Sequence, residues 1–366
     1  MRLIQSNIIA PAVIVITLAL FFCAALWSVR VQAQKVTQLP PPPPVPRYKP
    51  KPTPTPEPPQ YEVLKVNSNL VMVPVSVTDA NGQPVLGLRV EDFRIEENGH
   101  PQQIAQIGDP EQVPLDIALL IDVSGSVSTR FGFEQQAAAR FLRQVLKPED
   151  RATVFAIDEQ PRFIQPLTSA SIASEKLMTI NTANGYTAFF DSVLAAANYL
   201  ERSSATGRRR IIVVISDGDD TARILDVSVA RSRAGNLQVI NMDAQLQLIQ
   251  QATENTLRDV QRAEATFYSI NPSGQTMHLN VRSARSEKGL ERISSGTGGA
   301  SFLPRDESDL AAIFQRIAAE IRSQYLLQYY SNNEAAGREF RKIVVKTPAQ
   351  SQFKVRTREG YFPKAN

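Results

Sequence analysis

Five side chains with oxygen atoms that can coordinate a cation lie at three separated points of the chain, each beside an apolar run. They are Asp122, Ser124, Ser126, Thr187 and Asp217. The first three fall in the stretch ALLIDVSGSVS at residues 118–128, where an apolar run ends. A carboxylate at the end of a buried strand is costly unless something pairs with it, and hard cations prefer small oxygen ligands. The three residues of this stretch, Asp122, Ser124 and Ser126, therefore predict a site for a divalent cation held by oxygen.

The composition excludes other kinds of metal site. Cys23 is the one cysteine and lies in the N-terminal apolar segment, and the two histidines are His100 and His278. We therefore expect no disulfide, no thiolate cluster and no histidine-rich zinc site in the folded part. The 40 basic and 36 acidic residues give a net charge of +4, which is too balanced to indicate a nucleic-acid partner.

The middle of the chain, residues 113–323, alternates apolar runs with helical patterns. The runs are 116–121, 152–157, 211–215, 265–270 and 300–303. This alternation predicts an α/β fold: a doubly wound, mostly parallel sheet with helices on both faces. Ligands of such sheets bind outside the carboxyl ends of the strands, so the three donor-bearing loops are expected to meet there. Residues 221–264 are too long for a single helix and its loops, and 244–260 predict an extra or extended helix.

These five residues resemble the metal-ion-dependent adhesion site of the von Willebrand factor type A family. That site combines the pattern Asp-x-Ser-x-Ser with a threonine from a second loop and an aspartate from a third. The wider chain, with the phrase SGTGG at 295–299 and the ending YLLQYY at 325–330, is similar to exported von Willebrand factor A-related proteins of bacteria, notably of Acidobacteria. This resemblance implies a Rossmann-like fold and a metal site made by all five residues.

The same resemblance implies a binding module rather than an enzyme. The hydroxyls of Ser124, Ser126 and Thr187 would hold Mg²⁺, or Mn²⁺ or Ca²⁺, while the two carboxylates orient bound waters. A cation with neutral ligands stays electrophilic, so an Asp or Glu carboxylate of a protein or peptide partner can take an open position. Three further side chains are predicted at the rim of the ligand site: Ser128, Tyr186 and Asp219.

Three other interpretations of these residues stay open at this stage. The serines can cap the following helix while Asp217 makes a turn. A metal-dependent hydrolase or phosphotransferase can use Asp122 as its nucleophile, although no nearby lysine or histidine offers acid or base help. A structural scaffold can use the ion only to stabilise its loops.

The N-terminal part predicts export. Residues 8–27 are uncharged and long enough to cross a bilayer, and a small-residue pattern near Ala33 suits cleavage. Residues 1–34 are therefore either a cleaved export signal or a retained membrane anchor, which gives a periplasmic or extracellular location, tethered or secreted. Residues 35–61 form a proline-rich linker, expected to be an extended stalk.

Both flanks of the middle region predict β-structure. Residues 62–112 show period-two valines, and residues 324–366 show strand composition with turn residues. Each flank is too small to bury a core alone, so we expect the two to pack as one β-rich domain. Pro74 indicates that the first strand is an edge strand. The face shared by Lys354, Arg356 and Arg358 is interpreted as a solvated sheet surface, with contact to an anionic polymer or lipid headgroups as the alternative.

Overall fold

The structure is a computed structural model of the chain. It describes residues 70–124, 130–223, 242–274, 281–306, 308–333, 337–347 and 352–363, all within the compact unit Val66–Asn366. The predicted export segment and the proline-rich linker lie outside these residues, as do Ser126 and Ser128. Among the helices of the described ranges, none is both long enough and apolar enough to cross a membrane.

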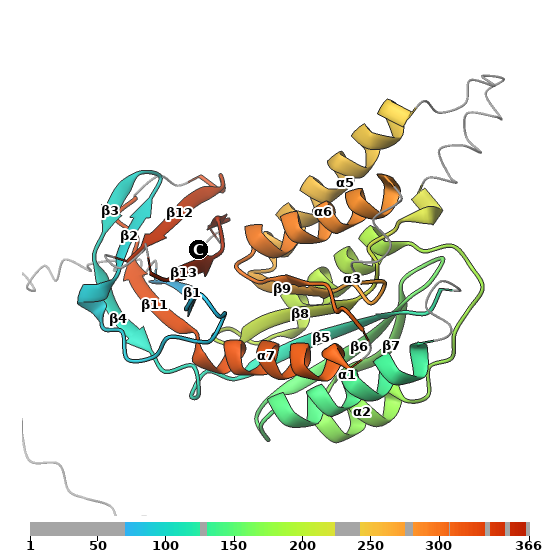
Figure 1. Cartoon of the computed structure of the whole chain (residues 1–366). Helices are drawn as coiled ribbons and strands as arrows, with labels where there is room; N and C mark the ends of the chain where they lie inside the picture. The colour runs from blue at the N-terminus through green and yellow to red at the C-terminus, as the bar shows by residue number, and fades with distance from the viewer. Residues whose placement is uncertain are drawn as a thin grey trace, which may run out of the picture. The chain divides into compact units, whose positions relative to one another are not determined.

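A six-stranded sheet forms the centre of the middle region, in the order β10-β9-β8-β5-β6-β7 (Figure 1). Its strands are β5 (Leu115–Asp122), β6 (Arg151–Ile157), β7 (Arg162–Thr168), β8 (Arg209–Ile215), β9 (Ala265–Ile270) and β10 (Ser301–Phe302). All neighbours pair in parallel except β7, which runs antiparallel to β6 at the sheet edge. The sequence did not predict β7, because this edge strand is half exposed and contains Pro166. The predicted α/β fold class is confirmed.

Helices cover both faces of this sheet (Figure 1). One layer packs α1, α2 and α7 into one apolar core, and the other packs α3, α5 and α6 into a second. The helices are α1 (Phe131–Val145), α2 (Ala170–Leu177), α3 (Phe189–Ser203), α5 (Met242–Arg262), α6 (Val281–Gly296) and α7 (Asp309–Ser323). In β5, Leu119 and Ile121 face the first core while Leu120 faces the second, which explains the continuous apolar run. The 21-residue α5 is the long helix predicted within residues 221–264.

The two flanks meet in a pair of antiparallel sheets. The first has the order β13-β1-β11-β4 and the second β14-β12-β2-β3. Their strands are β1 (Leu70–Thr78), β2 (Arg94–Glu97), β3 (His100–Gln102), β4 (Ile104–Gly108), β11 (Tyr325–Tyr330), β12 (Arg341–Lys346), β13 (Lys354–Thr357) and β14 (Gly360–Tyr361), and a 3-10 helix, η1 (Val90–Asp92), precedes β2. Strands from both flanks pair directly and share an apolar core. The small β-rich part therefore contains both flanks.

One local prediction for these sheets is wrong. Pro74 does not mark an edge strand, since β1 lies between β13 and β11. The ladder with β13 begins one residue later, at Val75 opposite Thr357, so the missing N–H of the proline breaks no hydrogen bond there. Residues 353–362, within the C-terminal flank of strand composition, form two short strands, β13 and β14, which residues 358–359 separate.

The basic face of β13 is not a solvated surface, which corrects the sequence interpretation. Lys354 is exposed, but Arg358 is buried and donates to the Met72 carbonyl at 2.9 Å. Arg356 forms an ion pair with the buried Glu320 of α7. Arg356 therefore joins the β-rich part to the helix that leads into β11, whereas Arg358 is bonded to β1 within the β-rich part. The sequence could not show this because the partners are far apart along the chain.

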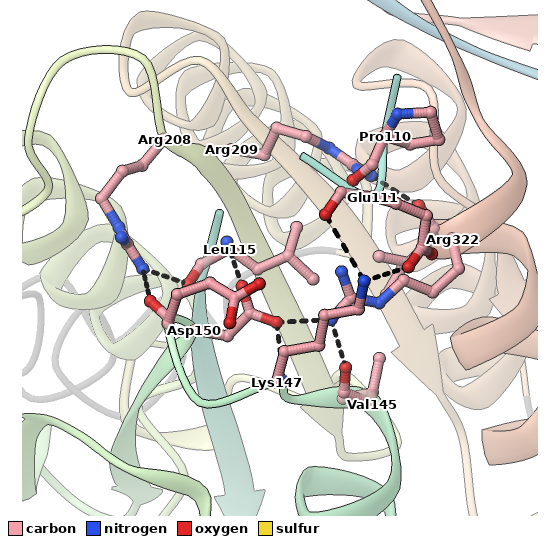
Figure 2. A network of polar contacts seen from close by, with 11 residues as sticks. Pro110, Glu111, Leu115, Val145, Lys147, Asp150, Arg208, Arg209 and Arg322 are labelled. Atoms are coloured by element: carbon pink, nitrogen blue, oxygen red, sulfur yellow. Dashed lines mark hydrogen bonds and ion pairs between the residues drawn. The ribbon is translucent and has the colours of Figure 1, made fainter. Parts of the chain in front are cut away.

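A polar network ties the amino ends of the central strands to α7 (Figure 2). Asp150 accepts hydrogen bonds from the Leu115 and Lys147 backbone N–H groups, at 2.7 and 2.8 Å, and pairs with Arg322 of α7. Arg209 donates at 2.7 Å to the carbonyl of Ile321. Burial lowers the pKa of Arg209 to about 10, so it stays charged at neutral pH. The last turn of α7 is therefore fixed at the sheet edge opposite the predicted site.

Gly299, just before β10, lies so close to the backbone of β9 that it leaves no room for a side chain. A Cβ atom on Gly299 would lie 1.9 Å from the Phe267 carbonyl oxygen. Gly299→Ala is therefore expected to lower the free energy of unfolding by about 1–3 kcal/mol through overpacking. The control is Gly132→Ala in α1, where nothing lies within 4 Å, and a gain of about 0.5–1 kcal/mol is expected. Urea unfolding of both variants measures the difference, and equal effects would contradict the described turn.

Candidate metal site

The first cluster of the site lies where β5 and β8 end side by side. Ile121 is paired with Ile215, so Asp122 and Ser216 follow at the same level. Asp122 Oδ2 accepts a 2.7 Å hydrogen bond from the Ser216 hydroxyl, and Asp122 Oδ1 accepts a 2.9 Å hydrogen bond from the Ser124 backbone N–H. The carboxylate is thus held by one donor from the loop after β5 and one from the loop after β8.

The Asp122 carboxylate is fully buried among neutral donors, which favours a bound cation beside it. The Asp122 side chain is 0% exposed. Burial raises the pKa of Asp122, hydrogen bonds from Ser124 and Ser216 oppose that rise, and the negative charge of Asp219 adds to it. The donors that the structure describes around Asp122 are neutral. A charge held without a cation costs free energy, and a divalent ion beside the carboxylate would offset that cost.

The second loop, which carries Thr187, is attached to the other strand ends through its backbone. Its Ala183 N–H donates to the Val123 carbonyl at 2.7 Å, and its Ala188 N–H donates to the Asp158 carbonyl at 2.8 Å. Thr187 itself is 5% exposed. Hydrogen bonds therefore hold this loop against the residues that follow both β5 and β6.

Thr187 is also attached to the loop after β8. Its backbone N–H donates to Thr221 Oγ1 at 2.7 Å, and its carbonyl accepts the Ala222 N–H at 3.2 Å. Neither contact uses the Thr187 hydroxyl. The second and third predicted loops are therefore neighbours at the carboxyl edge of the sheet.

Each acidic side chain after β8 accepts a hydrogen bond from a different partner. One oxygen of Asp217 accepts the Asp219 N–H at 3.1 Å, which makes the turn that was one alternative for this residue. Asp219 accepts a 2.6 Å hydrogen bond from the Ser286 hydroxyl of α6. The buried Asp220 accepts the Phe190 N–H at 3.0 Å and therefore satisfies a donor of the first turn of α3. Burial raises the pKa of Asp220.

The structure brings the four described members of the predicted set, Asp122, Ser124, Thr187 and Asp217, to one edge of the sheet, on three segments joined by hydrogen bonds. The helix-cap alternative is wrong for Ser124, because α1 begins only at Phe131. Ser126, and the rim residue Ser128, lie outside the described ranges. Tyr186, predicted at the rim, is 49% exposed.

Two contributors, Ser216 and Thr221, had no predicted role. Ser216 follows the apolar run of β8 directly, and a polar residue at that position is a signal of a strand end. Its contact with Asp122 depends on the register between β5 and β8, which the sequence does not contain. Thr221 bonds to a residue 34 positions away, so no local pattern indicates its role.

The donor set fits a hard divalent cation rather than zinc. Its members are carboxylate and hydroxyl oxygens, which Mg²⁺ and Mn²⁺ accept. Within the described ranges, no group of three or more His, Cys, Asp or Glu side chains is placed to hold a metal. Ser124 and Thr187 would be the direct ligands, and the bound ion would supply a Lewis acid for an incoming carboxylate.

This geometry coincides with a family match. Residues 117–219 match the von Willebrand factor type A domain. The match begins within β5 and ends in the loop after β8, so it contains Asp122, Ser124, Thr187 and Asp217. We refer to residues 117–219 as the type A region. A search of curated proteins gives no match to the chain.

Several solved structures are similar to this chain. An aerotolerance-related membrane protein from Bacteroides fragilis is 14% identical, with 57% of this chain and 98% of that chain covered and a TM-score of 0.40. A von Willebrand factor type A protein from Catenulispora acidiphila is 16% identical, with 70% and 51% covered and a TM-score of 0.41. The PilB minor pilin from Streptococcus sanguinis is 14% identical, with 58% and 62% covered and a TM-score of 0.41. The chain thus spans about half of the second protein and less than two thirds of the third.

Proposed function

We propose that the type A region is a divalent-cation-dependent binding module of an exported protein. The ion, Mg²⁺ or Mn²⁺, is held by the hydroxyls of Ser124, Ser126 and Thr187, with Asp122 and Asp217 orienting its bound waters. An Asp or Glu carboxylate of a protein or peptide partner completes the coordination shell. The observation that carries this proposal is the buried carboxylate of Asp122, held by neutral donors on two loops that meet at the carboxyl edge of the sheet.

The location follows from the predicted export segment. Residues 1–34 bring the folded part out of the cytoplasm, either as a retained anchor or as a signal cleaved near Ala33, and residues 35–61 separate it from the membrane surface. A binding module on such a stalk can reach partners in the periplasm or outside the cell.

Peptide capture by the full chain tests this function. The protein, kept in a mild detergent, is exposed to an Asp- and Glu-containing peptide library and to a matched library with Asn and Gln, in Mg²⁺ and in EDTA. Capture of the acidic library alone, lost in EDTA, is the expected result. Turnover of phosphate esters would instead support the hydrolase alternative, and metal binding without capture or turnover would support the scaffold.

A further inference from the structure

The loop after β8, taken together with the helical residues 221–223 that follow it, contacts both of the other loops that carry predicted ligands. Ser216 donates to Asp122 after β5, and Thr221 accepts from Thr187 before α3. The same loop is held from outside by α6, through Ser286 and Asp219. It therefore lies where it can set the positions of ligands that other segments contribute.

The Ser216 hydroxyl joins two carboxylate-bearing segments. A hydroxyl carries one proton to donate and lone pairs to accept. Ser216 donates its proton to Asp122 Oδ2 at 2.7 Å and accepts the Gly218 N–H at 3.0 Å. Gly218 directly follows Asp217 and has a φ of +78°, which glycine adopts at little cost. One buried hydroxyl thus fixes both Asp122 and the turn that presents Asp217.

Thr221 has the corresponding contact with Thr187. Its Oγ1 accepts the Thr187 N–H at 2.7 Å, so the loop after β8 holds the backbone of Thr187. Because the contact is made to the backbone, it orients the residue without using the hydroxyl that would bind the ion. Both contacts have the geometry of groups that orient ligands rather than ligate.

We propose that Ser216 and Thr221 are positioning residues of the metal site, through which the loop after β8 aligns Asp122 and Thr187. This inference rests on the proposed function, because it assumes a divalent cation at these residues. Outer groups that orient metal ligands typically change affinity by about 10–100-fold when removed. Ser216→Ala and Thr221→Val are therefore expected to weaken Mn²⁺ binding by about that factor.

The test is Mn²⁺ binding to the full chain, followed by the electron paramagnetic resonance signal of free Mn²⁺. Ser216→Ala is compared with Ser216→Thr, which keeps a hydroxyl and is expected to recover affinity. Ser174→Ala and Thr253→Val serve as matched controls, since each removes a buried hydroxyl that donates to a helix carbonyl elsewhere. Thermal unfolding in EDTA shows whether each variant folds without metal.

A double variant separates positioning from general destabilisation. If Ser216 acts through Asp122, adding Ser216→Ala to Asp122→Asn should cause little further loss of Mn²⁺ affinity. Wild-type affinity in both Ser216→Ala and Thr221→Val, together with loss in Asp122→Asn, would overturn this inference and leave the proposed function intact. Equal losses in the two controls would also overturn it. A wild-type chain that binds no Mn²⁺ would instead overturn the proposed function and this inference with it.

Discussion

Replacement of Asp122 by Ala is expected to abolish metal-dependent capture of acidic peptides, with an affinity loss of at least about 100-fold. The carboxylate lies at the end of a core strand, fully buried, and hydrogen-bonds to both neighbouring loops. Its removal deletes the charge that balances the ion and the carboxylate that Ser216 holds in place. Outer groups alone change affinity by about 10–100-fold, so loss of this charge should reach or exceed the upper end.

The same variant is expected to keep its fold without metal. Ligands that bind only the folded state raise its stability, so Mg²⁺ should raise the melting temperature of the wild type and not that of Asp122→Ala. In EDTA the melting temperatures of the two chains should lie within a few degrees of each other. The cost of burying the Asp122 charge largely offsets the stability that its two hydrogen bonds contribute. Asp259→Ala, which removes an α5 carboxylate paired with Arg262, is the control. Unfolding of both Asp122→Ala and Asp122→Asn in EDTA would show that Asp122 is structural.

The second large effect is expected at Glu320, away from the candidate metal site. This buried carboxylate of α7 accepts hydrogen bonds from Ser76 of β1 at 3.0 Å and from Tyr268 of β9 at 2.9 Å, and it pairs with Arg356 of β13. Glu320→Ala leaves the Arg356 guanidinium largely buried and removes the one carboxylate that pairs with it among the described residues. Removal of one partner of a buried pair typically costs about 3–5 kcal/mol, and we expect a loss of that size.

Urea unfolding of the full chain measures this effect. The control is Arg162→Ala, which breaks a more exposed pair with Asp158 and should cost about 0–1 kcal/mol. Because Glu320 joins β1 and β13 to β9, a single cooperative transition is expected in the wild type, and Glu320→Ala should shift its midpoint. Equal costs for the two variants, or separate wild-type transitions for the α/β and β-rich parts, would contradict the described interface.

Much of the fold follows from short-range patterns. The apolar runs of β5, β6, β8 and β9 are continuous because helices cover both sides, and that is what the sequence predicted. The edge strand β7 escaped prediction because a half-exposed strand with a proline lacks that signal. Arg356 of β13 was misinterpreted because a charged side chain looks solvated until its partner, 36 residues away, is known.

In the candidate site, too, some residues were predictable from the sequence and others depend on contacts between distant segments. Asp122, Ser124 and Asp217 were indicated by residue type and by position after apolar runs, and Thr187 by its loop before a helical pattern together with the family resemblance. The contributions of Ser216 and Thr221 depend on strand register and loop contact over 94 and 34 positions. Residue type, position and the family resemblance therefore predict candidate ligands, whereas the groups that hold them require the three-dimensional arrangement.

The most direct test of the central claim is a crystal structure of the protein grown with Mn²⁺, with anomalous diffraction recorded near the manganese edge. We predict one strong anomalous peak at the carboxyl edge of the sheet, within about 2.0–2.4 Å of hydroxyl oxygens of Ser124 and Thr187 and bridged by water to Asp122. A fully loaded crystal with its manganese elsewhere, or with Thr187 turned away from the ion, would contradict the account.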